Sequence, residues 1–245
     1  MKRLAAILCG LWAALAFAGD AAHAEKRVAL VVGNGAYQNA PALATTANDA
    51  NAIADLLKRN GFDVVEVRTD LGNTDFKRAV REFSASVRDA DVAVMYFGGH
   101  GVDIGGKNYL LPVDAKLTSD QDADDEAVSL ERVMAMLQGA KRLRVVLLDA
   151  ARDNPMVRAM QRSKGGSPSG LARFEPDADD TFVVYSARPG SVADDIAGDR
   201  GAFANALLKN LAVPGRDLRT AIGFARDDVI NATGGKQEVL VVGSF

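Results

Sequence analysis

Short apolar runs alternate with amphipathic segments along most of the chain. The runs are rich in Val, Leu and Phe and end at glycine or at a charged residue, which is typical of buried parallel strands. The segments between them repeat apolar residues at helical spacing, as Phe76, Val80, Phe83 and Val87 do. The expected strands are 27–33, 62–67, 91–97, 142–149 and 181–187, with 238–242 as a candidate sixth, and the expected helices are 49–61, 75–90, 130–140, 201–212 and 217–235.

Residues beside these helices predict where the helices begin and end. Asn48, Thr74 and Ser129 each precede a helical pattern and are residue types that cap helix N-termini. Gly61 follows the first helix, where glycine suits the left-handed backbone of a C-terminal cap. Residues 107–114, "KNYLLPVD", predict a small hairpin or a strand end.

Strands that alternate with helices imply right-handed crossovers and a mostly parallel sheet with helices on both faces. In such α/β folds, sites form at the carboxyl ends of the strands. Gly33, His100 and Asp149 all fall at expected strand ends. The sequence therefore predicts a functional site at this edge of the sheet.

Two of these residues allow either a structural or a chemical role. His100, in "GGHG", suits a general acid or base, and equally a histidine that packs or caps a turn. Asp149 ends an apolar strand, where a carboxylate is costly unless it is paired or solvated. It is either a partner for Arg152 or a loop N–H, or a buried anion that captures a basic side chain. Asp49, at the start of the first helix, has a plain role in helix-end electrostatics.

The N-terminus predicts a secretory signal. Lys2 and Arg3 precede an apolar run over residues 4–18, and residues 22–24, "AHA", fit a small-residue cleavage pattern. The run is shorter than the ~20 residues that a membrane-spanning helix needs. We expect residues 1–24 to be removed and residues 25–245 to form one domain. The protein would then be exported, periplasmic or secreted, with no stable membrane anchor after cleavage.

Composition excludes several classes of protein. The chain has 245 residues, of which 48% are hydrophobic, enough for one large core. A net charge of −3 gives no electrostatic case for nucleic acid. Residues 33–35, "GNG", lack the third glycine of a dinucleotide motif, and no Walker lysine follows. The single cysteine, Cys9, lies in the expected signal, so the mature chain would have no cysteine zinc site and no cysteine nucleophile.

Two polar segments remain. Residues 152–178 are rich in Gly, Ser, Pro and charge and predict a long mobile loop. Residues 119–126, "SDQDADDE", predict an exposed acidic loop. Their spacing matches no EF-hand, so we expect no metal and no cofactor, with calcium as the weaker alternative.

Several motifs together resemble those of one peptidase family. The stretches "RVALVVGNGAYQNAPAL", "ANDA", "YFGGHG", "NYLLPVDAKL" and "LLDAARDNP" look like those of the bacterial caspase-like peptidases, the metacaspase and orthocaspase group of clan CD. They run from about residue 26 to about residue 235 in the same order and spacing. The resemblance implies a p20-like domain with a caspase-like three-layer sandwich, in which a six-stranded, mostly parallel sheet has helices on both faces.

The resemblance also assigns site residues. The catalytic histidine of the family falls on His100, and its nucleophilic cysteine falls on Ala151. The backbone N–H groups of Gly101 and Ala151 would form the oxyanion hole, which an alanine can still supply. Asp49 and Asp149 match the two carboxylates that select Arg or Lys at P1. The expected partners are therefore peptide or protein segments with basic residues.

Three hypotheses follow from these assignments. The chain is an exported pseudo-peptidase that binds basic segments, or an active cysteine endopeptidase whose nucleophile was replaced by alanine for study. A small-molecule or nucleotide-binding α/β domain is the third, and the missing phosphate motif argues against it. Without a nucleophile, Ser163 does not substitute and the loop that carries Arg158, Arg162 and Lys164 should stay uncut. The oligomeric state does not follow from the sequence.

Overall fold

A computed structural model describes residues 25–154, 158–161, 170–193 and 198–244. The expected signal peptide, Ser163, Arg162 and Lys164 lie outside these described residues. The expected loop over 152–178 is described in part, and its described residues contain no strand. Within the part of the chain that the structure covers, no helix combines the length and apolar character that crossing a membrane requires.

A six-stranded sheet forms the centre of the molecule, as the alternating pattern predicts. The strand order is β2-β1-β3-β7-β8-β9, and every pairing is parallel except that of β9 with β8. β3 is buried along its whole length, which explains its continuous apolar sequence. The strands are β1 (Arg27–Gly33), β2 (Val64–Thr69), β3 (Val92–Gly98), β7 (Leu143–Asp149), β8 (Thr181–Tyr185) and β9 (Leu240–Ser244).

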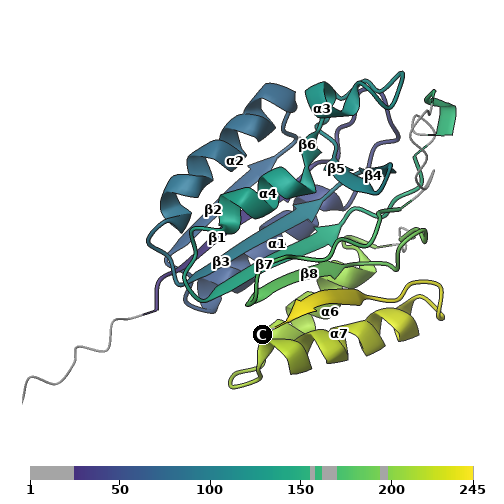
Figure 1. The fold of residues 1–245 in the computed structure, drawn as a ribbon. Coiled ribbons are helices and arrows are strands. Elements are labelled where there is room, and N and C mark those ends of the chain that lie inside the picture. Colours follow the sequence, from purple (N-terminus) through teal and green to yellow (C-terminus); the bar gives the residue numbers. More distant parts are fainter. Residues whose placement is uncertain (1–24, 155–157, 162–169, 194–197, 245) are drawn as a thin grey trace, which may run out of the picture.

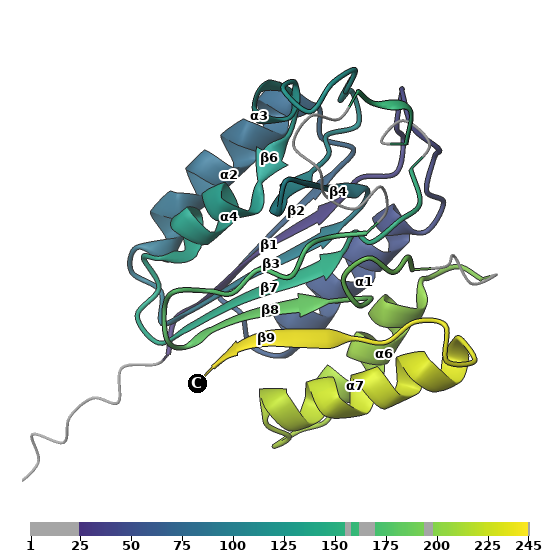
Figure 2. The same cartoon turned by 45° about the vertical axis from the view of Figure 1, so that its right-hand side comes forward.

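Helices cover both faces of the sheet and make three layers (Figures 1 and 2). Side chains of α2 and α4 pack with one face, and those of α1, α6 and α7 pack with the other. The fold class expected from the sequence is therefore confirmed. The helices are α1 (Thr46–Arg59), α2 (Asn73–Val87), α4 (Leu130–Leu137), α6 (Ala202–Leu211) and α7 (Leu218–Ala232).

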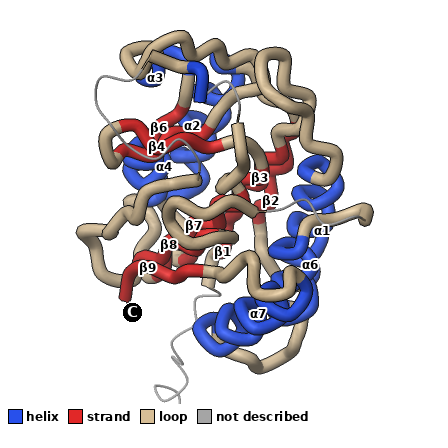
Figure 3. Tube along the Cα trace, turned by 90° about the vertical axis from the view of Figure 1, so that its right-hand side faces the viewer, coloured by secondary structure: helices blue, strands red, loops and turns tan. Residues whose placement is uncertain are grey.

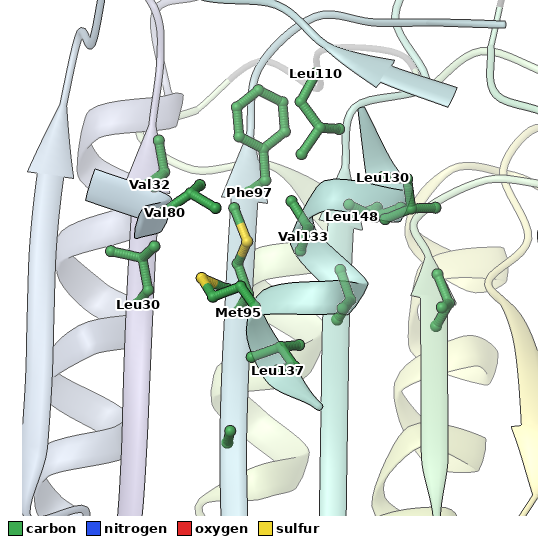
Figure 4. Close-up of a cluster of buried hydrophobic side chains, with 14 of the residues drawn as sticks. Leu30, Val32, Val80, Met95, Phe97, Leu110, Leu130, Val133, Leu137 and Leu148 are labelled. Carbon is green, nitrogen blue, oxygen red and sulfur yellow. The ribbon is translucent and has the colours of Figure 1, made fainter. Parts of the chain in front are cut away.

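The larger core lies between the sheet and the α2–α4 layer. Figure 4 shows Leu30, Met95 and Leu148 from three neighbouring strands, with Val80 of α2 and Val133 of α4 against them. These side chains are almost fully buried. Each such side chain contributes roughly 1.5–3 kcal/mol when removed from water, so this layer holds the sheet and its strand ends rigidly.

A small second sheet lies beyond the end of β3. β4 (Gly101–Ile104) and β5 (Lys107–Leu110) form an antiparallel hairpin, which β6 (Val128–Ser129) extends to three strands. The hairpin predicted for residues 107–114 therefore includes residues 101–104 as its first strand. Because β4 follows His100 directly, the hairpin fixes the chain on the C-terminal side of that residue.

Two helix caps differ from the prediction. α1 begins at Thr46 with Thr45 at the N-cap position, so Asn48 lies inside the first turn and its side chain donates to the carbonyl oxygen of Asp199. α2 begins at Asn73, not after Thr74, because Asp114 accepts the Asn73 N–H at 2.8 Å from a distant loop. A cap supplied by a residue so far along the chain leaves no local sequence signal.

Two other predicted helix boundaries are confirmed. Ser129 accepts the Arg132 N–H and caps α4, and Gly61 follows α1 with φ +79°. The prediction of an exposed acidic loop is wrong in part, since residues Ala123–Glu126 form the short helix α3 and Asp120 is buried. Asp122 is partly exposed at the N-cap position of that helix, where it accepts N–H groups of residues 118 and 119.

Candidate functional site

The carboxyl ends of β1, β3 and β7 meet at one edge of the sheet. Gly33 pairs with Gly98, and Gly98 pairs with Asp149, so the three strands end level with one another. His100 lies two residues beyond β3 and Ala151 two residues beyond β7. The Gly99 N–H donates to the carbonyl oxygen of Asp149 at 3.1 Å, which holds the two departing loops together. Figure 3 looks onto this edge, where the loops gather.

His100 is buried and fixed in one orientation. Its Nε2 lies 2.9 Å from the carbonyl oxygen of Pro41. A carbonyl oxygen only accepts hydrogen bonds, so Nε2 carries the proton and Nδ1 carries the lone pair. Among the described residues, Nδ1 has no hydrogen-bond partner. Burial lowers the pKa of His100 below its usual value, and the positive charge of Arg152 acts in the same direction. The ring therefore holds its proton on Nε2, and its accepting nitrogen Nδ1 is buried and unpaired among the described residues.

Tyr37 supports this histidine, and the sequence analysis did not identify it. Its hydroxyl accepts the His100 backbone N–H at 2.8 Å and donates to the carbonyl oxygen of Leu111 at 3.0 Å. The two rings meet edge to face with centroids 4.6 Å apart. Burial raises the pKa of Tyr37, which keeps its hydroxyl protonated as a donor. Tyr37 and Pro41 belong to the polar stretch after β1, where only the family motif gave a signal.

The carboxylate of Asp70 fixes the start of that stretch. Its Oδ1 accepts the N–H groups of Gly35 and Ala36 at 2.8 and 2.9 Å. Asn34, the first residue after β1, is buried and donates its backbone N–H to the carbonyl oxygen of Gly98. The loop that carries Tyr37 and Pro41 is thus anchored to both neighbouring strands. These contacts place the Pro41 carbonyl against His100.

One expected oxyanion donor is already engaged. The Gly101 N–H donates to the carbonyl oxygen of Ala150 at 3.0 Å. Binding an oxyanion there would require this hydrogen bond to break. A side chain at Gly101 is excluded on packing grounds, because a Cβ atom would lie 2.7 Å from Leu171 Cδ2 and 3.0 Å from the Ala150 oxygen.

Asp49 and Asp149, hereafter the acidic pair, come together from distant segments. Asp49 lies in the first turn of α1, Asp149 ends β7, and both side chains are buried. Between them lies Gly201, just before α6, whose N–H donates to Asp49 Oδ1 at 3.1 Å. A Cβ atom at Gly201 would lie 3.3 Å from Asp49 Oδ2 and 3.5 Å from Asp149 Oδ2. The role of Gly201 had no signal in the sequence.

Burial is the main perturbation at Asp49. It raises the pKa of Asp49 to about 6, and the neighbouring Asp149 carboxylate adds to the rise. The N–H of Gly201 and the positive charge of Arg152 act in the opposite direction. Two carboxylates held this close favour a cationic group between them.

Arg152 supplies such a cation within the chain. Its Nη2 lies 3.3 Å from Asp149 Oδ1, and the side chains are only 4% and 2% exposed. The sequence left two roles open for Asp149, and the structure contains one of them, the pairing with Arg152. Nη2 would also lie 3.9 Å from a Cβ at Gly201, so the guanidinium borders the same space as both carboxylates.

Ala151 is covered in this conformation. It packs in a small buried cluster with Ala187 and Ala193, and the Ala193 N–H donates to the Ala151 carbonyl oxygen. Its methyl group has no atom that can attack a carbonyl or hold a proton. His100, the acidic pair and Ala151 thus share one sheet edge, and the resemblance places a nucleophile where Ala151 has a methyl group.

Other features lie away from this edge. A pocket of about 680 Å³ lies between α7 and the β8–β9 edge, and Arg188, Arg226 and Glu238 are among its lining residues. Both arginines pair with Glu238. Across the part of the chain that the structure describes, no three His, Cys, Asp or Glu side chains gather in a way that could hold a metal ion.

Comparison with known proteins identifies the family. The chain matches the model of the caspase domain, peptidase C14, over residues 26–242, and it belongs to this family. It is also 28% identical over 134 residues to the human mucosa-associated lymphoid tissue lymphoma translocation protein 1. That match covers 54% of this chain and 16% of the human protein. The mouse homologue is 28% identical over 130 residues, or 53% of this chain and 15% of the relative.

Proposed function

We propose that this chain is a caspase-fold pseudo-peptidase that binds a basic segment of a peptide or protein without cleaving it. The observation that carries the proposal is the acidic pair, two buried carboxylates brought together next to position 151. Buried carboxylates are costly unless a cation or hydrogen-bond donors compensate them. A ligand with Arg or Lys at its P1 position supplies the compensating charge, and one with Asp or Glu adds repulsion.

The missing nucleophile separates binding from cleavage. In a cysteine–histidine dyad the thiolate attacks the carbonyl carbon while the histidine handles the proton. His100 can accept a proton at Nδ1, but the methyl side chain of Ala151 has no acidic proton to give and no lone pair. Loss of the nucleophile from a serine protease costs on the order of 10⁶ in kcat. Any hydrolysis by water alone would therefore be residual.

A matched peptide pair tests this proposal. Two fluorescent peptides that differ only at P1, Arg in one and Glu in the other, are titrated against the chain by fluorescence polarisation. We expect the Arg peptide to bind and to remain intact by mass spectrometry. Equal affinity for the two peptides would remove the role proposed for the acidic pair, and multiple turnover would show that the chain is not a pseudo-peptidase.

A second candidate is an active endopeptidase from which only the thiol has been removed. The geometry of His100 favours it, since Nε2 is anchored on Pro41 and Nδ1 is left as the accepting nitrogen, unpaired among the described residues. A base held in one tautomer is what a nucleophilic thiol requires. Sequencing codon 151 of the native gene distinguishes the two candidates, because a cysteine codon would establish that the alanine was introduced.

We also propose that the protein is exported. The support is the sequence of residues 1–24, with the basic start, the apolar run and the Ala-His-Ala site. Expression of the full chain in a bacterium with a periplasm should give a mature protein that begins at Glu25. N-terminal sequencing of the periplasmic fraction checks this. An intact N-terminus in the cytoplasmic fraction alone would contradict it.

A further inference from the structure

The guanidinium of Arg152 lies where a ligand's basic side chain would have to go. It pairs with Asp149 at 3.3 Å and borders the space beside Gly201 that both members of the acidic pair also border. The side chain is 4% exposed, so it is buried rather than resting on the surface. Guanidinium is also the group that pairs best with carboxylates, because its N–H donors match their geometry.

The position of Arg152 in the chain ties it to the site. It follows Ala151 directly, and Ala151 is covered by Ala187 and held by the Ala193 N–H. The backbone segment that would contact a ligand at position 151 therefore also carries the Arg152 side chain, which lies beside the acidic pair. A second guanidinium that entered the acidic pair would meet direct repulsion from the guanidinium of Arg152.

We propose that Arg152 is a built-in occupant of the acidic pair, which a basic ligand must displace before it binds. This inference rests on the proposed function, since it takes the acidic pair as the ligand's site. Arg152 and the ligand compete for the same two carboxylates. The apparent affinity for the ligand is therefore the intrinsic affinity multiplied by the fraction of molecules in which Arg152 has left the acidic pair. A tenfold preference for the inward position weakens ligand binding about tenfold.

Removing the Arg152 side chain tests the competition. The probe is N-acetyl-arginine methylamide, and N-acetyl-norleucine methylamide is the neutral control of similar length. Both are titrated by calorimetry against the parent chain, Arg152→Ala and Arg158→Ala. Arg158 is a matched control because it is exposed, pairs with Asp153 and lies six residues along the same segment.

We expect Arg152→Ala to bind the arginine probe about tenfold more tightly than the parent chain or Arg158→Ala. The norleucine probe should bind all three chains equally weakly. The parent chain and Arg152→Ala could both prefer the arginine probe over the norleucine probe to the same degree. That result would refute the proposal that Arg152 occupies the acidic pair, while the proposed function would stand. If neither chain prefers arginine to norleucine, the proposed function fails and the inference fails with it.

A second measurement, of hydrogen exchange at Arg152, uses the parent chain and so does not require that a variant folds. In the parent chain labelled with ¹⁵N-arginine, the Nε–H of buried Arg152 should exchange slowly with water. Saturating arginine probe should expel the side chain and make that proton exchange at the rate of the exposed arginines. An Arg152 signal that stays protected while the probe is bound would overturn the inference.

Discussion

Nε2 of His100 donates a hydrogen bond to the carbonyl oxygen of Pro41 at 2.9 Å. This one contact sets the tautomer of the ring and leaves Nδ1 as the accepting nitrogen. Burial also lowers the pKa of His100, which favours the neutral form of the ring. In the proposed function, His100 is the proton acceptor of a peptidase site and the side chain of Ala151 has no proton to offer.

Replacing Ala151 by cysteine should therefore produce a peptidase. We expect Ala151→Cys to cleave after Arg or Lys, with activity lost again in Ala151→Cys/His100→Ala. The gain over the parent chain should be large, since loss of a nucleophile costs on the order of 10⁶ in kcat. A fluorogenic substrate with Arg at P1 measures it, with the Asp substrate as control. If Ala151→Cys cleaves no basic substrate, His100 does not serve as the base.

Asp49 should make stability fall as pH rises. Its pKa is raised to about 6 in the folded chain from an ordinary 3.8, so the folded state holds the proton more tightly between these values. The free energy of unfolding should then decrease from about pH 4 to about pH 6, by up to about 3 kcal/mol for a shift of this size. Urea titrations across this range should show the decrease in the parent chain and lose it in Asp49→Asn.

Asp122 provides a control of opposite sign. Hydrogen bonds from Thr118 and Ser119 lower its pKa to about 2. Its contribution to stability is present above about pH 4 and is lost as pH falls toward 2. Asp122→Asn should therefore leave the slope between pH 4 and 6 unchanged. If the parent chain and Asp49→Asn show the same slope there, the account of Asp49 is wrong.

Gly33 should tolerate no side chain, because α1 packs directly on the end of β1. A Cβ atom at Gly33 would lie 2.5 Å from the Thr46 carbonyl oxygen and 2.7 Å from Ala50 Cβ. Gly33→Ala should destabilise the chain by about 1–3 kcal/mol and move the helix that carries Asp49. Thermal and urea unfolding measure the loss.

Gly223 is the matched comparison for Gly33. It lies inside α7, and a Cβ atom there would meet nothing within 4 Å. Alanine in a helix interior is better than glycine by up to about 1 kcal/mol, so Gly223→Ala should stabilise the chain. Equal effects at the two positions would mean that the contact between β1 and α1 is not as close as the structure has it.

The sequence predicted the sheet because its strands are continuous apolar runs separated by helical patterns. Buried strands such as β3 leave a signal that needs no knowledge of their partners. The same holds for His100 and Asp149, which stand where apolar strands break. The wrong start predicted for α2 has a different cause, since the cap on α2 comes from Asp114, which lies outside the helix sequence.

The parts of the site that the sequence missed depend on contacts between distant segments. Tyr37 reaches the His100 backbone from a loop 63 positions away, and Gly201 reaches Asp49 from 152 positions away. No periodic pattern marks such residues. The sequence allowed the pairing of Arg152 with Asp149 as one of two roles for that carboxylate. Only the structure shows where the guanidinium lies relative to Gly201.

The central claim is that the acidic pair recognises a basic side chain, and a double-mutant cycle tests it most directly. Peptides with Arg or norleucine at P1 are titrated against the parent chain and Asp149→Asn, each with and without Arg152→Ala. We predict that the parent chain prefers Arg, that Arg152→Ala increases this preference about tenfold, and that Asp149→Asn abolishes it in both backgrounds. A preference for Arg that survives Asp149→Asn undiminished would contradict the account.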